Sequence, residues 1–146
     1  MDEPESYQQR QIETLVASIV DGYSTEEPPV PIEKILSDPP RGLSRIDISD
    51  LSLIFGVGEH EHEYRLALGR LLYRELCRCG RAGDLPYTND VARQFATALL
   101  MPREWIRTTA RSPRITLHRL SEIYQVPEYA VARRLVQLGL RVPGMD

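Results

Sequence analysis

The stretch "RLALGRLLYRELC", from Arg65 to Cys77, decides the fold because its apolar residues recur at helical spacing. It predicts a helix from Tyr64 to about Cys79. The side chains expected to form its buried stripe are Tyr64, Leu68, Leu71, Leu72 and Leu76. Arginines spaced by four, four and three residues share a different face of this helix: Arg70, Arg74, Arg78 and Arg81.

On the N-terminal side of this helix, the sequence predicts two further helices and a pair of strands. An amphipathic pattern runs from Glu5 to about Tyr23, and a short helix begins at Ile32. The segments "LSRIDISD" (43–50) and "LSLIFGVG" (51–58) are typical of short strands that form a hairpin or meander. We therefore expect a small β-sheet early in the chain.

On the C-terminal side, Thr88 or Asn89 is expected to cap a helix that Pro102 stops. The segment 115–140 then predicts two short helices joined at "YQVPEY" (124–129), an arrangement similar to a helix-turn-helix. The 146 residues suit one domain, residues 1–146. The expected class is α+β: mostly helical, with the small early sheet and a C-terminal helix pair.

Composition and charge limit the classes of partner. No apolar run approaches the roughly 18 residues needed to cross a bilayer, and the acidic N-terminus does not look like a signal peptide, so we expect a cytoplasmic protein without a membrane partner. Residues 1–63 contain 4 basic and 14 acidic residues, whereas residues 64–146 contain 14 basic and 7 acidic ones. This asymmetry indicates either a charged partner or packing of the acidic half against the basic half.

Three segments resemble the ImmA/IrrE-type zinc metallopeptidase family of bacteria and their mobile elements. They are "PPVPIEKIL" (28–36), "ARQFATALLMP" (92–102) and "LSEIYQVPEYAVARRLVQLGL" (120–140). The resemblance covers about residues 10–140, and Arg93 stands where the family usually has asparagine. It implies a zincin-like domain with a peptidase-like core at 10–110 and a C-terminal helix pair at 114–142.

The resemblance fails at the chemistry of the site. It places the family's H-E-x-x-H motif on residues 70–74, so that Arg70 and Arg74 occupy the two zinc-ligand positions and Leu71 the general-base position. The third ligand position falls on Asn89. Arginine has no lone pair for a metal, and each guanidinium would repel a cation by about 4 kcal/mol per unit charge pair at 4 Å and a dielectric of 20. We therefore expect no catalytic residue, no metal and no cofactor in the inherited site.

The first hypothesis is a catalytically inactive, regulatory protein-binding module. Arg70, Arg74 and Arg93 would clamp an acidic peptide segment or a helix-turn-helix repressor of a mobile element. The alternative that these arginines pair with acidic residues of the same chain stays open.

The second hypothesis is DNA binding through the C-terminal helix pair. On that interpretation Gln125, Tyr129, Arg133 and Arg134 lie near the groove. A third alternative is a zinc endopeptidase with relocated ligands, for which only His60, His62 and His118 are available as imidazoles.

Overall fold

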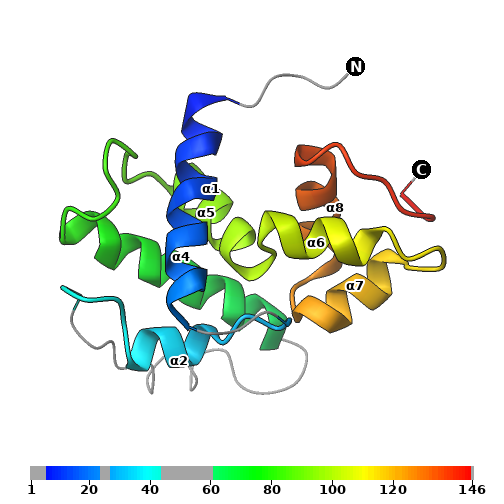
Figure 1. The fold of residues 1–146 in the computed structure, drawn as a ribbon, viewed down its shortest axis with the longest axis horizontal. Coiled ribbons are helices and arrows are strands. Elements are labelled where there is room, and N and C mark those ends of the chain that lie inside the picture. The colour runs from blue at the N-terminus through cyan, green and yellow to red at the C-terminus, as the bar shows by residue number, and fades with distance from the viewer. Residues whose placement is uncertain (1–5, 24–26, 44–60, 146) are drawn as a thin grey trace.

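The computed structural model describes residues 6–23, 27–43 and 61–145, and every regular element in those ranges is a helix (Figure 1). In chain order the elements are α1 (Tyr7–Val20), the 3₁₀ helix η1 (Asp21–Tyr23), α2 (Ile32–Ser37), α4 (Glu61–Arg78), α5 (Asn89–Leu100), α6 (Arg103–Ala110), α7 (Leu117–Tyr124) and α8 (Glu128–Gln137). The expected α+β class is therefore wrong for this part of the chain, which is helical.

The two segments predicted as strands lie outside the described residues, apart from Leu43, which belongs to no regular element. In the described ranges, the helices bury their apolar faces against one another and use no sheet. Helix α4 also begins earlier than predicted, at Glu61. Residues 61–63, which precede the predicted start at Tyr64, thus belong to the first turn of α4.

Helices α4 and α5 form the centre of the fold. A Cβ atom on Gly69 would lie 2.8 Å from the Cβ and 3.0 Å from the Cα of Ala96, so only glycine lets the two backbones come this close. Four residues later, the Tyr73 hydroxyl donates a hydrogen bond to the carbonyl of Pro86, at 2.6 Å. The Tyr73 ring also packs against Phe95, with 5.2 Å between ring centroids. These contacts run in opposite directions along the two helices, which are therefore antiparallel.

The helix ends follow the capping residues of the sequence. The side-chain oxygen of Thr88 accepts a hydrogen bond from the Val91 amide at 3.1 Å, which confirms the predicted cap of α5. Helix α5 ends at Leu100, and Pro102 precedes the first residue of α6. The predicted C-terminal helix pair is also confirmed, with Pro127 at the N-cap of α8.

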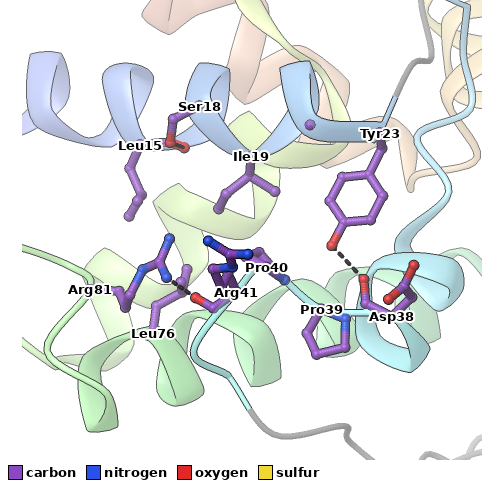
Figure 2. Close-up of a pocket in the computed structure, with 11 residues that line it drawn as sticks. Leu15, Ser18, Ile19, Tyr23, Asp38, Pro39, Pro40, Arg41, Leu76 and Arg81 are labelled. Atoms are coloured by element: carbon purple, nitrogen blue, oxygen red, sulfur yellow. Dashed lines mark hydrogen bonds between the residues drawn. The ribbon is translucent and has the colours of Figure 1, made fainter.

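Helices α1 and α2 pack on this central pair. Helix α1 lies against α5, and α2 lies against α4 (Figure 1). The Tyr23 hydroxyl, just after α1, donates to the carbonyl of Asp38 at 2.7 Å and thereby ties the end of η1 to the end of α2 (Figure 2). Burial raises the pKa of this hydroxyl, and the nearby negative charge of Asp38 raises it further.

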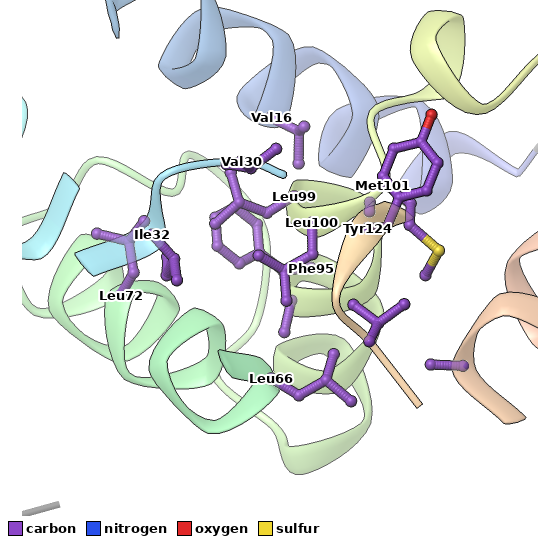
Figure 3. Close-up of a cluster of buried hydrophobic side chains, with 14 of the residues drawn as sticks. Val16, Val30, Ile32, Leu66, Leu72, Phe95, Leu99, Leu100, Met101 and Tyr124 are labelled. Carbon is purple, nitrogen blue, oxygen red and sulfur yellow. The ribbon is translucent and has the colours of Figure 1, made fainter. Parts of the chain in front are cut away.

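The apolar core lies where these helices meet, and side chains from α1, the segment before α2, α4 and α5 converge there (Figure 3). A buried arginine borders it. The Arg65 guanidinium is 6% exposed and donates to the carbonyls of Val30, at 2.8 Å, and Gln125, at 3.2 Å. Burial lowers the pKa of Arg65, and Glu33 and Glu61 oppose that change. Arg65 thus joins α4 to the segment before α2 and to the α7–α8 turn.

Candidate functional site

The positions that would carry a zinc site are at or near the surface of the helical core. Arg70 and Leu71 are half-buried on α4, and Arg74 is exposed. Asn89 is the exposed first residue of α5. No hydrogen bond or ion pair joins Asn89 to Arg70 or Arg74 in the described part of the chain. Neither Arg70 nor Arg74 forms an ion pair with a described carboxylate. Within the described residues, the alternative that these two arginines pair with acidic residues of the same chain therefore has no support.

Arg93 and Arg133 border a common groove of about 500 Å³ between α5 and α8. Its lining comprises Asp90, Arg93, Gln94, Thr97, Arg133 and Gln137. The Gln94 amide donates to Asp90 Oδ2 at 2.9 Å. Both arginines are exposed, and neither donates a hydrogen bond to another described residue. The groove therefore presents two guanidinium groups whose donors are available to a ligand.

Tyr129 links this groove to Arg70. Its hydroxyl donates to the Glu63 carboxylate, with 2.9 Å to each oxygen, and its side chain remains 53% exposed. Partial burial and the Glu63 carboxylate raise the pKa of Tyr129, whereas the positive charges of Arg70 and Arg133 lower it. Both guanidinium groups thus act on one hydroxyl. We name the set Arg70, Arg93, Arg133 and Tyr129 the arginine surface, because Arg133 both lines the groove with Arg93 and acts with Arg70 on Tyr129.

Arg134, a candidate for DNA contact, is buried, and that prediction is wrong. The side chain is 0% exposed, and its Nη1 and Nη2 atoms bind the two carboxylate oxygens of Glu13 at 2.5 and 2.8 Å. Its Nε donates to the carbonyl of Met101 at 3.0 Å, and Nη1 also reaches Gln137 at 2.7 Å. Four of the five N–H donors of this guanidinium are thus used inside the fold.

The other DNA-contact candidates differ in their availability. Gln125 is half-buried in the left-handed conformation, with φ of 56°, and its carbonyl accepts from Arg65. Tyr129 and Arg133 are exposed, although the Tyr129 hydroxyl is bound to Glu63. Arg133 is separated from Arg134 by about 100° around the helix, which explains why one faces outward and the other inward.

Relocated zinc ligands find no support in the described ranges, where no group of three or more His, Cys, Asp or Glu side chains is placed to hold a metal ion. His60 lies outside the described residues. His62 is half-buried near the start of α4. His118 is exposed and lies 3.2 Å from Glu122 Oε1 and 3.5 Å from Glu128 Oε2.

Sequence reasoning missed Glu13 and Arg65, which are buried ionisable side chains that join remote segments. Glu13 had a visible signal: it lies three residues before Val16 and seven before Val20, on the buried stripe of α1. A carboxylate on such a stripe requires a buried cation. Arg65 had no comparable signal, because its acceptors are backbone carbonyls.

No helix in the described ranges is both long enough and apolar enough to cross a bilayer.

Comparisons with known proteins assign neither a family nor a function to the chain. No protein-family model, no curated protein and no solved structure matches it. The resemblance to ImmA/IrrE-type peptidases therefore stays a prediction from the sequence.

Proposed function

We propose that the chain is a regulatory protein-binding module that captures an acidic segment of a partner on the arginine surface. The observation that carries this proposal is the absence of internal partners: Arg70, Arg93 and Arg133 bind no described carboxylate, although the chain has an excess of acidic residues. Carboxylates of a partner would accept charge-assisted, bidentate hydrogen bonds from these guanidinium groups. A helix-turn-helix repressor with an acidic segment is the partner class that we favour.

The magnitudes indicate how such a surface binds. An exposed ion pair contributes about 0.2–1 kcal/mol, so three of them supply at most about 3 kcal/mol, which is too little for a stable complex. An aromatic contact is needed in addition, and the half-exposed Tyr129 ring, on whose hydroxyl Arg70 and Arg133 act, can provide it. We therefore expect a partner segment with carboxylates around an apolar side chain.

Peptide hydrolysis by a zinc-bound water is not part of the proposed function. Arg70 and Arg74 replace the ligands that the resemblance requires, and Leu71 replaces the base. Leucine cannot accept a proton, and guanidinium cannot bind a cation. The proposed role is thus capture without cleavage.

The test is a titration with a fluorescein-labelled helical peptide that carries glutamates around a central leucine, with a glutamine peptide of the same length as control. The glutamate peptide should bind, and its affinity should fall with added salt. The triple variant Arg70→Glu, Arg93→Glu and Arg133→Glu should lose binding. The charge-matched control Arg111→Glu, Arg114→Glu and Arg119→Glu changes three other exposed arginines and should retain it. Equal binding of both peptides, or binding by the triple variant, would contradict the proposal. Co-purification with a repressor, abolished by the same triple variant, would extend it.

DNA binding remains the second candidate because Tyr129 and Arg133 are exposed on α8. A role in DNA binding would also need the exposed Arg114 and Arg119 to contact phosphates. Duplex affinity that falls in Arg114→Ala and Arg119→Ala, but not in Arg70→Glu, would favour this candidate.

A further inference from the structure

A second cavity lies on the opposite end of α4 from Glu63, between α1, the end of α2 and the residues after α4. Its volume is about 460 Å³, within the range of small-molecule sites. The apolar wall is formed by Leu15 and Ile19 of α1 and Leu76 of α4 (Figure 2). Leu76 and Ile19 are buried, and Leu15 is half-buried, so this wall is continuous with the core.

Two guanidinium groups lie at one end of this cavity. Arg81 Nη1 donates to the carbonyl of Arg41, which fixes the Arg81 side chain beside the turn after α2 (Figure 2). Gly42 allows this approach: its φ is +98°, and a Cβ there would lie 3.2 Å from Arg81 Nη1. Neither Arg41 nor Arg81 forms an ion pair with a described carboxylate. Two like charges thus face this end of the cavity, and neither forms an ion pair within the described part of the chain.

The other end of the cavity has the opposite charge. Asp38 lies beside Tyr23, away from Arg81 (Figure 2). The Tyr23 hydroxyl is already engaged with the Asp38 carbonyl. A ligand with a carboxylate at both ends would bring its second charge toward Asp38, which would repel it. A ligand with a single carboxylate, bound at the arginine end, avoids this repulsion.

We propose that this cavity binds a small organic monocarboxylate with an apolar body. The carboxylate would accept hydrogen bonds from Arg41 and Arg81, and the body would lie on Leu15, Ile19 and Leu76. The arginines provide the geometry that a planar carboxylate needs, and the apolar wall excludes water from the rest of the ligand. This site shares no residue with the arginine surface, so a test of one proposal does not decide the other.

The experiment is an amide-resolved NMR titration of the full chain with 4-phenylbutyrate, and the uncharged 4-phenylbutyramide serves as the matched control. Shift changes should map to the residues that line the cavity. The acid should bind at least about ten-fold more tightly than the amide, because only the acid gains charge-assisted hydrogen bonds. The diacid suberate should bind more weakly than 4-phenylbutyrate.

Variants test the site itself. Arg41→Gln and Arg81→Gln should each weaken binding of the acid by about ten-fold. Gly22→Phe should abolish it, because Gly22 lines the cavity and a Cβ there meets no atom within 4 Å. Arg78→Gln, an exposed position on α4 outside the cavity, should have no effect. Circular dichroism establishes that each variant is folded, and Arg41→Gln remains informative should Arg81→Gln disturb the turn. Equal affinity for acid and amide, shifts that map elsewhere, unchanged binding by Gly22→Phe, or no binding of the acid up to its solubility limit would each overturn the proposal.

Discussion

Replacing Arg134 by methionine is expected to lower the free energy of unfolding by about 3–5 kcal/mol, because the substitution leaves a buried carboxylate without its cation. That carboxylate belongs to Glu13, which is 5% exposed on α1 and accepts from both terminal nitrogens of Arg134. Methionine fills a comparable volume, so loss of packing contributes little to the expected change.

A double-mutant cycle isolates the interaction between the two side chains. Glu13→Leu leaves the guanidinium buried and should also cost about 3–5 kcal/mol, so the two single changes add to roughly 6–10 kcal/mol. The double variant removes both charges. In the double variant the Met101 carbonyl still loses its donor, which should lower the free energy of unfolding by about 1–3 kcal/mol.

Urea denaturation followed by circular dichroism measures these free energies, provided that the slope with denaturant is the same in all four proteins. Either of two results would refute the reasoning: single variants that lose less than about 1 kcal/mol, which is typical of an exposed pair, or a double variant that loses the full sum.

Three further predictions concern stability. Gly69→Ala should lower the melting temperature because the new Cβ meets the α5 backbone, with a net cost of about 1–2 kcal/mol after the better helix propensity of alanine, whereas Gly22→Ala, which meets no atom, should not. Arg65→Met should cost about 2–5 kcal/mol in urea denaturation, because two backbone carbonyls lose their donor; a loss under about 1 kcal/mol would contradict this role. Burial raises the pKa of the Tyr73 and Tyr124 hydroxyls above 10.0, so the folded chain holds protons that the unfolded chain releases. The contribution of these two hydroxyls to stability should therefore be constant below about pH 10 and fall above it. Spectrophotometric titration of tyrosinate, showing these two hydroxyls ionise only on unfolding, checks the last expectation.

Local signals in the sequence were sufficient for most helix boundaries. Thr88, Pro102 and Pro127 each fix a helix end through their own backbone or side chain, so no knowledge of the rest of the fold was needed. The predicted sheet rested on imperfect alternation in 43–50 and a short apolar run in 51–58, which are weak signals, and only Leu43 of these segments lies in the described part of the chain.

Side-chain environment was harder to predict than secondary structure. Arg133 and Arg134 are adjacent and identical in type, yet one lines a groove and the other is buried. The difference depends on Glu13, which is 121 positions away. Similarly, nothing local to Arg41 indicates that the Arg81 side chain donates to its carbonyl. Such pairings arise only when helices are placed in three dimensions.

The span between Glu13 and Arg134 also constrains how the protein matures during translation. When α1 leaves the ribosome, its apolar stripe already contains a carboxylate whose counter-ion has not yet been synthesised. Docking of α1 on the other helices before α8 exists would desolvate that charge without a counter-ion. Early docking of α1 is therefore unfavourable. We therefore expect a chain that ends before residue 134 to leave α1 undocked, because the Glu13 carboxylate would have no buried cation.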